Sequence, residues 1–308
     1  MDVHTRPPLL LTGATGYVGG ALLAELLSRG HRVRCLVRRP ETPDLAGRHP
    51  GIEVAGGDVL DGRGLPEALA GTEVAYYLVH SMGRGSGPDA DFADRDRRGA
   101  ANFGAAARAA GVRRVVYLGG LESEGAASEH LSSRREVARV LAEHVDEVVH
   151  ARAAMIIGSG SASFEILSHL VRRLPAMLTP RWVDTRSQPV ALQDVVTALA
   201  RLAEQDEVPD EVQLGGADVL TYREMMSRFA AVAGRRAPTI VRVPVLSPRL
   251  SSYWVSLFTP VERGLVRPLV DGLSAEMVVR RPPPPGINDH PIGFDDAVRA
   301  ALDGRRGS

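Results

Sequence analysis

The chain contains 308 residues, and its 37 lysines and arginines are matched by 37 aspartates and glutamates. This length accommodates one large domain or a core domain with a smaller lobe. The balanced charge argues against nucleic acid or an anionic membrane surface as the main partner. The single cysteine, Cys35, rules out a disulfide framework. No stretch has the length of a membrane span, and the first residues lack a signal-peptide pattern. We therefore expect a cytoplasmic protein without stable membrane insertion.

Short apolar runs alternate with helical patterns from residue 9 to about residue 158. Strands that alternate with helices of this length usually pair in parallel through right-handed crossovers. The pattern therefore predicts a Rossmann-type, doubly wound α/β sheet. In chain order, the expected strands cover 9–13, 31–38, 51–58, 73–80, 112–120 and 146–158, and the expected helices cover 17–30, 62–71, 91–111 and 131–144.

The regular alternation ends beyond this point. Thr221 and Glu224 have the spacing of a capping box, which marks the start of a helix. Four prolines interrupt the apolar segment 239–280, so this segment cannot form one long helix. Helices are expected within 159–175, within 189–205 after a short strand, over 221–234, and in the late run FDDAVRAAL.

A glycine-rich loop, TGATGYVGG, connects the first expected strand to the first expected helix. Gly13 allows a tight turn, Gly16 lets the backbone approach a pyrophosphate, and Gly19 permits close packing of helix against strand. The N-terminus of the helix offers N–H groups and the positive end of its dipole to phosphates. Between a strand and a helix of a βαβ series, this glycine triplet is a strong sign of a dinucleotide cofactor. The predicted contact residues are Gly13, Ala14, Thr15, Gly16, Tyr17, Val18 and Gly19.

The ends of the second and third strands bear on the form of the cofactor. NAD sites usually place an acidic residue after the second strand, whereas this chain has Arg38 and Arg39. Guanidinium groups suit the 2′-phosphate of NADP(H), so NADP(H) is favoured over NAD(H); a solvated basic turn is the alternative. Asp58 and Val59, at the end of the third strand, are further predicted cofactor contacts. Asp58 either reaches the adenine amino group or caps the following turn.

The segments TGATGYVGG, GGDVLD, VRRVVYLGG and RAAMIIG, in this order and spacing, resemble the atypical short-chain dehydrogenase/reductase (SDR) family. The segments AYYLVHSMG, EHLSSR and GSGSASFEIL resemble in particular its NmrA-like and YbjT-like NAD(P)H-binding members. The resemblance implies an NADP-binding Rossmann domain over 1–158. It also implies a smaller C-terminal substrate lobe over 159–308, intertwined with the first domain. Within the first domain it places Val79, His80 and Gly119 beside the cofactor.

The catalytic positions of the wider superfamily are altered in this chain. Active members carry a serine or threonine after the fifth strand, and a tyrosine and a lysine one helical turn apart. Here the strand ends in Gly119 and Gly120, the tyrosine position falls on His130, and the lysine position falls on Arg134. Because residues four apart share a helix face, the resemblance implies that Arg134 binds the cofactor ribose. His130 is suited either to transfer a proton or to serve as a surface or capping residue.

Candidate substrate contacts follow the expected strands. His80 and Ser81 end the fourth strand, where a doubly wound sheet places its ligand crevice. His80 either contacts the nicotinamide or substrate, or only closes the strand. Glu122 follows the double glycine and Ser161 follows the sixth strand, with a solvated loop as the alternative for Glu122. Trp254 lies in an apolar segment that could roof a pocket, form a dimer face or contact a membrane; its arginines favour the first two. No pattern of metal ligands is found, so we expect no metal.

These features predict an NADP(H)-dependent oxidoreductase that reduces a small apolar carbonyl, enone or quinone. Two alternatives stay open. One is a non-catalytic NAD(P)-binding redox sensor or regulator of the NmrA type, and the other is an NAD(P)-dependent epimerase or dehydratase. A homodimer is compatible with either class of protein.

Overall fold

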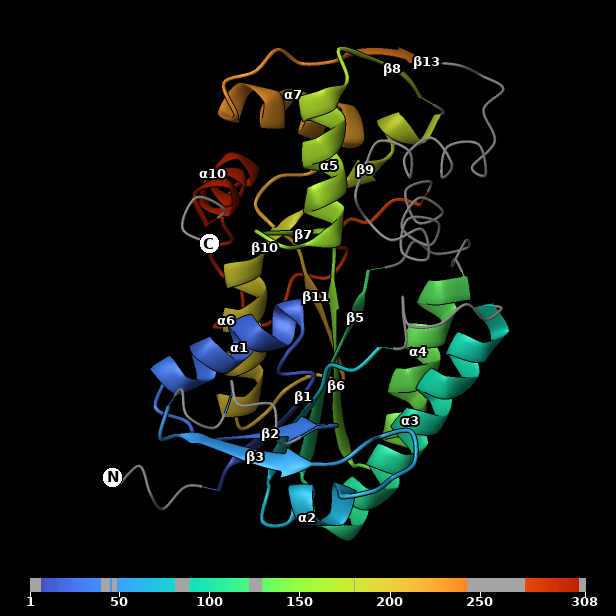
Figure 1. Cartoon of the computed structure of the whole chain (residues 1–308), viewed down its shortest axis with the longest axis vertical. Coiled ribbons are helices and arrows are strands. Elements are labelled where there is room, and N and C mark those ends of the chain that lie inside the picture. The colour runs from blue at the N-terminus through green and yellow to red at the C-terminus, as the bar shows by residue number, and fades with distance from the viewer. Residues whose placement is uncertain are drawn as a thin grey trace. The chain divides into compact units, whose positions relative to one another are not determined.

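The computed structural model describes residues 7–39, 45, 49–80, 89–121, 129–179, 181–242 and 275–304. The chain forms two compact units, drawn in Figure 1. The first unit consists of residues 1–119, 132–152 and 196–212, and the second consists of residues 120–131, 153–195 and 213–308. Each unit is therefore assembled from separate stretches of the chain.

A seven-stranded sheet of order β11-β6-β5-β4-β1-β2-β3 is the framework of the first unit. The strands from β3 to β5 pair in parallel, which confirms the predicted doubly wound α/β class. The order reverses between β1 and β4, and a doubly wound sheet binds its ligand at such a reversal, outside the carboxyl ends of the strands. The strands are β1 (Leu9–Thr12), β2 (Val33–Val37), β3 (Ile52–Gly56), β4 (Val74–Tyr77), β5 (Arg114–Gly120), β6 (Glu147–Ala153) and β11 (Glu211–Leu214).

Helices cover both faces of this sheet, with α1 and α6 on one side and α3 and α4 on the other (Figure 1). Neighbouring residues of β4 face opposite layers, as in any strand. The Tyr76 hydroxyl donates to the Leu199 carbonyl of α6 at 3.1 Å, whereas the Tyr77 ring packs on Phe103 of α3 with 5.0 Å between ring centroids. The helices are α1 (Tyr17–Ser28), α2 (Leu65–Leu69), α3 (Asp89–Ala109), α4 (Glu129–Ala142) and α6 (Leu192–Glu204).

The buried side chain of Arg114, on β5, ties α6 and the turn that follows it to the sheet. Its guanidinium donates to the carbonyls of Leu202, Gln205 and Asp206 at 2.6–2.9 Å and pairs with Glu147 at 2.6 Å. The chain then enters β11, which extends the sheet beyond β6. Strand β11 was not expected from the sequence, and the strand expected over 146–158 ends at Ala153.

Among its described residues the second unit has three α-helices, one short 3₁₀ helix (η2) and three small two-stranded sheets. The strands pair as β7 with β10, β9 with β12, and β8 with β13. The helices expected within 159–175 and over 221–234 are confirmed, as is the late helix, but β8, β9, β12 and β13 were not anticipated. The elements are β7 (Ile156–Ile157), α5 (Ala162–Arg173), β8 (Ala176–Thr179), η2 (Arg181–Asp184), β9 (Arg186–Ser187), β10 (Val190–Ala191), β12 (Leu220–Thr221), α7 (Tyr222–Val232), β13 (Thr239–Arg242) and α10 (Phe294–Gly304).

Helix ends in the second unit are fixed by side chains. The predicted capping box is confirmed: the Glu224 amide donates to the Thr221 hydroxyl, and the Thr221 amide donates to the Glu224 carboxylate at 2.7 Å. Asp218 accepts from the Phe294 amide at 2.7 Å at the start of α10. Arg228 of α7 pairs with Asp218 at 2.9 Å and thereby joins the two helices.

Candidate cofactor site

The glycine loop after β1 has the geometry that its sequence predicts. Gly13 has φ 73°, and a side chain there would approach the Leu78 carbonyl oxygen to 2.8 Å. The Gly16 amide donates to the Gly13 carbonyl at 2.8 Å and closes a tight turn. A Cβ atom on Gly19 would lie 2.0 Å from the same carbonyl oxygen. The tight turn at Gly13 and the close approach at Gly19 are therefore both present.

The loop is anchored between β1 and β4. The buried Thr12 hydroxyl donates to the Tyr76 carbonyl at 3.0 Å and accepts from the Leu78 amide at 2.8 Å. Helix α1 begins at Tyr17, and its N-cap residue, Gly16, has no side-chain oxygen to offer the first amides. The first turn of α1 also lacks acidic side chains, so its positive dipole end suits an anionic diphosphate. Contacts of the seven predicted loop residues with a cofactor remain predictions.

Two basic side chains follow β2. Arg38 and Arg39 are both exposed, and the strand end carries no acidic residue. An acid here would repel a 2′-phosphate, whereas a guanidinium can bind one through charge-assisted hydrogen bonds. The arrangement is compatible with the predicted preference for NADP(H).

The turn after β3 is held by hydrogen bonds to its own backbone. Asp58 Oδ1 accepts from the Leu60 amide at 2.9 Å, so the capping role proposed for Asp58 is observed. The Asn102 side-chain amide, from α3, donates to the carbonyls of Val59 and Leu60, each at 3.0 Å. Val59 itself is buried. The segment where the adenine contact is predicted therefore has a fixed backbone.

Three rings lie next to one another: His80, which follows β4, Tyr117 in the middle of β5 and His150 in the middle of β6. His80 contacts the edge of Tyr117, with 6.0 Å between ring centroids, and Tyr117 stacks on His150 at 5.2 Å and 28°. A Cβ atom on Gly119 would lie 2.2 Å from His150 Nε2. The His150 imidazole thus occupies the space that a hydroxyl side chain at the end of β5 would need.

Burial governs the ionisation of these groups. Burial, followed by the positive charge of Arg152, lowers the pKa of His150 to about 4, so the imidazole is neutral at pH 7. Burial raises the pKa of Tyr117, an effect that the Arg134 guanidinium partly offsets. Each of Tyr117, His150 and Arg134 has a buried polar atom without a hydrogen-bond partner among the described residues. These atoms are Tyr117 Oη, His150 Nε2 and Arg134 Nε.

The structure places the other predicted site residues as follows. Val79 and His80 are half-buried just after β4. Arg134 lies on α4, one turn after His130; the His130 side chain lies outside the described residues. The Ser161 hydroxyl, in the second unit, donates to the Ile156 carbonyl at 2.7 Å. The hydroxyl would have to give up this hydrogen bond to donate to a substrate. Ser81, Glu122 and Trp254 lie outside the described residues.

Tyr117 and His150 were missed by the sequence analysis. The available signal was a histidine inside VVHARA, a run expected to be a buried strand, because buried histidines need a partner or a function. No group of metal-ligating side chains occurs among the residues that the structure covers. Within that part of the chain, no helix has the length and apolar character of a membrane span.

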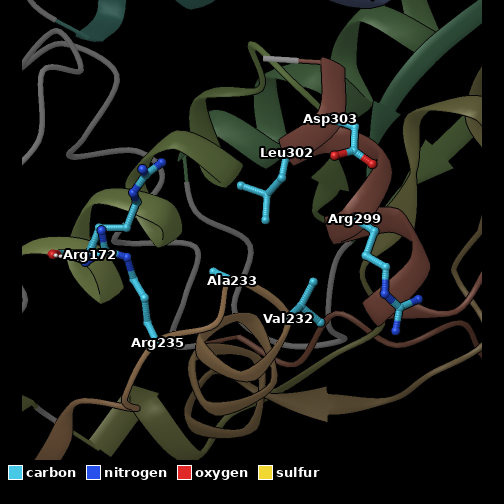
Figure 2. A pocket seen from close by; sticks show the side chains of 7 residues that line it. All are labelled: Arg172, Val232, Ala233, Arg235, Arg299, Leu302 and Asp303. Atoms are coloured by element: carbon cyan, nitrogen blue, oxygen red, sulfur yellow. Dashed lines mark hydrogen bonds between the residues drawn. The ribbon is translucent and has the colours of Figure 1, made fainter. Parts of the chain in front are cut away.

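A cavity of about 360 Å³ lies in the second unit (Figure 2). Arg172 and Arg235 lie on one side of it, and Arg299 and Asp303 lie on the opposite side. Its arginines are exposed, and Arg299 pairs with Asp296. None of its residues was a predicted site residue. They are Arg172, Val232, Ala233, Arg235, Arg299, Leu302 and Asp303.

Several curated proteins are similar to this chain in sequence. The ceramide reductase of Caulobacter vibrioides is 29% identical over 86% of this chain and 84% of its own length. Sterol demethylase protein B of Methylococcus capsulatus is 36% identical, but the match spans 39% of this chain and 38% of that protein. A 3β-hydroxysteroid dehydrogenase/Δ5→4-isomerase of Mycobacterium tuberculosis is 36% identical over 35% of this chain and 30% of its own length. For two of these relatives, the match with this chain thus spans less than half of the relative's length.

Solved structures share the fold. The crystal structure of gox2253 covers 98% of both chains with a TM-score of 0.73 and 25% identity. The triphenylmethane reductase of Citrobacter sp., complexed with NADP(H), covers 96% of this chain and 100% of its own, with a TM-score of 0.75 and 19% identity. This second likeness concerns the fold alone. Residues 13–158, from the glycine loop to just past β7, match the family model described as NAD(P)H-binding, so this part of the chain belongs to that family.

Proposed function

We propose that this protein is an NADP(H)-dependent oxidoreductase of the atypical SDR type that reduces an apolar carbonyl compound. The observation that carries the proposal is the glycine loop, which Thr12 fixes at the point where the strand order reverses. That point is where a doubly wound sheet binds its ligand. Three similar proteins are named a ceramide reductase, sterol demethylase protein B and a hydroxysteroid dehydrogenase/isomerase, which supports redox chemistry over other uses of the cofactor.

The preference for NADP(H) rests on Arg38 and Arg39. Both are exposed at the end of β2, where a phosphate of the cofactor can contact them. The buried thiol of Cys35 and the lack of other cysteines fit a reducing compartment, and we propose the cytoplasm.

The substrate class is suggested by the names of the relatives. Ceramide, sterols and hydroxysteroids are all apolar lipids. We therefore narrow the substrate to a lipid-like ketone or aldehyde, with enones and quinones as the next classes. The apolar segment around Trp254 is the proposed roof of the substrate pocket; it lies outside the described residues.

In this scheme the cofactor and the residues expected around it have distinct tasks. A bound dihydronicotinamide supplies the hydride. Arg134 binds the ribose and keeps a positive charge near the carbonyl oxygen. The proton comes from His130 or from water, since the usual tyrosine is replaced. We expect Gly119, at the end of β5, to lie beside the cofactor.

A non-catalytic sensor is the second candidate function. One specific observation favours it: the end of β5 has no hydroxyl, and a Cβ atom at Gly119 would collide with His150. The superfamily's usual serine is therefore sterically excluded, and a protein that only senses the cofactor would not need it.

Turnover separates the two candidates. The wild-type protein is mixed with NADPH or NADH and a panel of sterol ketones, long-chain ketones and quinones, and the loss of cofactor absorbance is followed. We expect substrate-dependent oxidation that is faster with NADPH. The control is Gly16→Val, which should abolish cofactor binding by calorimetry while the circular dichroism spectrum is kept. Tight binding of NADPH without turnover on any substrate would contradict the oxidoreductase and favour the sensor.

A further inference from the structure

The contact between Gly119 and His150 explains why the end of β5 carries no side chain. A Cβ atom on Gly119 would meet three atoms of the imidazole, at 2.2 Å from Nε2, 3.0 Å from Cδ2 and 3.3 Å from Cε1. The ring cannot easily move away, because it is buried and stacks on Tyr117. The imidazole of β6 therefore occupies the volume where a side chain at residue 119 would stand.

The position of His150 places a polar atom where the superfamily has its hydroxyl. Nε2 is the ring atom nearest to the missing Cβ, and it has no hydrogen-bond partner among the described residues. A buried polar atom without a partner costs about 1–3 kcal/mol. Such atoms in folded proteins call for an explanation, and one of the established explanations is a catalytic role.

The surroundings of the imidazole suit a neutral hydrogen-bond donor. Tyr117 supports one face of the ring, and Tyr117 Oη and Arg134 Nε also lack partners in the described structure. The cationic groups that act on His150 are Arg152, Arg134 and Arg135, and the opposing carboxylate is Glu211, paired with Arg152 at 3.0 Å. This excess of positive charge disfavours protonation of the ring and favours an oxygen that gains negative charge.

We propose that His150 supplies the hydrogen-bonding group that Gly119 lacks, and that His150 Nε2 holds the carbonyl oxygen of the substrate at the end of β5. The inference rests on the proposed reductase function. As hydride adds to the carbonyl carbon, negative charge develops on this oxygen, and a donor aimed at it stabilises the transition state. His150 donates a hydrogen bond and transfers no proton. Tyr117 is a positioning residue that keeps the ring in place.

The test exchanges the imidazole and the glycine together. His150→Phe keeps an aromatic ring against Tyr117 but removes Nε2. His150→Ala empties the space beside Gly119, and the double variant Gly119→Ser/His150→Ala returns a hydroxyl to the vacated place. The single variant Gly119→Ser is the steric control, and its thermal unfolding temperature should fall because the imidazole is still present.

We expect wild-type NADPH binding in calorimetry for His150→Phe, with kcat lowered by about 10²–10³, the usual effect of removing one oxyanion donor. His150→Ala should be equally slow, and the double variant should recover at least about tenfold in kcat because a serine hydroxyl can accept the same task. A purely structural role of His150 would not predict recovery through a hydroxyl on another strand.

The outcomes distinguish a failure of the role proposed for His150 from a failure of the proposed oxidoreductase function. If wild type turns over substrate and His150→Phe keeps its kcat, the role of His150 is refuted while the oxidoreductase stands. If His150→Phe does not fold, the double variant decides, and a kcat no higher than that of His150→Ala overturns the inference. If wild type binds NADPH but reduces nothing, the proposed function fails, and the role of His150 fails with it.

Discussion

Exchange of Gly19 for alanine probes how closely α1 packs on the glycine loop. A Cβ atom there would lie 2.0 Å from the Gly13 carbonyl oxygen, and 3.4 Å is where ordinary contact begins. The shortfall is roughly 1.4 Å (3.4 − 2.0) against backbone atoms, which cannot rotate away as a side chain can. Overpacking of this kind costs about 1–3 kcal/mol, and relief requires the loop itself to move.

Gly20 provides a matched control on the same helix. A Cβ atom on Gly20 would lie 3.5 Å from the Ala14 carbonyl oxygen, an ordinary contact. Both exchanges gain the same helix propensity, about 1 kcal/mol, so the propensity gain cancels when the two variants are compared. Gly20→Ala should therefore be stable or stabilised, and Gly19→Ala should have a free energy of unfolding lower by about 1–3 kcal/mol than Gly20→Ala.

Urea unfolding followed by circular dichroism measures this difference, and calorimetric titration with NADPH reports the loop geometry. We expect Gly19→Ala to bind NADPH more weakly than Gly20→Ala. Equal unfolding free energies and equal affinities in the two variants would refute the reasoning, because they would mean that the loop adapts to a Cβ atom without cost.

The remaining predictions concern charged and titratable groups. Arg38→Ala should narrow the preference for NADPH over NADH by roughly ten- to a hundredfold, since a hydrogen bond to a charged group contributes about 1.5–3 kcal/mol; an unchanged ratio of the two dissociation constants would assign Arg38 to a solvated turn. Arg114→Ala should lower the free energy of unfolding by about 3–5 kcal/mol, whereas Arg113→Ala, whose exposed side chain pairs with the same Glu147, should cost less than about 1 kcal/mol. Similar losses would refute the anchoring role of Arg114. Burial depresses the pKa of His150 from 6.5 to about 4, so the unfolded state takes up a proton that the folded state excludes. The unfolding free energy should fall on the order of 3 kcal/mol as pH drops from 6.5 to 4. His150→Phe should flatten this dependence, and identical pH profiles would count against a buried neutral imidazole.

Local turn chemistry explains why the cofactor loop could be predicted from sequence. Gly13 needs a positive φ, and Gly19 needs to lack a Cβ atom; both requirements follow from the spacing of the loop residues. The capping box at Thr221 was equally readable, since its two hydrogen bonds join residues three apart.

Long-range contacts explain what the sequence did not disclose. Strand β11 has four residues, and the turn that leads into it is held by Arg114 from 88 to 92 positions earlier in the chain. The pairing of Gly119 with His150 is also a tertiary contact between neighbouring strands. Gly119 and His150 lie on different strands and share no local sequence motif. The glycine therefore could not be used to predict the position of the imidazole from the sequence.

Hydride transfer is the central claim, and isotope labelling tests it most directly. Wild-type protein is incubated with NADPH that carries deuterium at the transferable position and with the best apolar ketone of the panel, and the alcohol formed is analysed by mass spectrometry. The account predicts one deuterium on the carbinol carbon of the product and none in product made with unlabelled cofactor. An alcohol without deuterium, or labelled NADPH that stays bound and unconsumed with every ketone, enone and quinone, would contradict it.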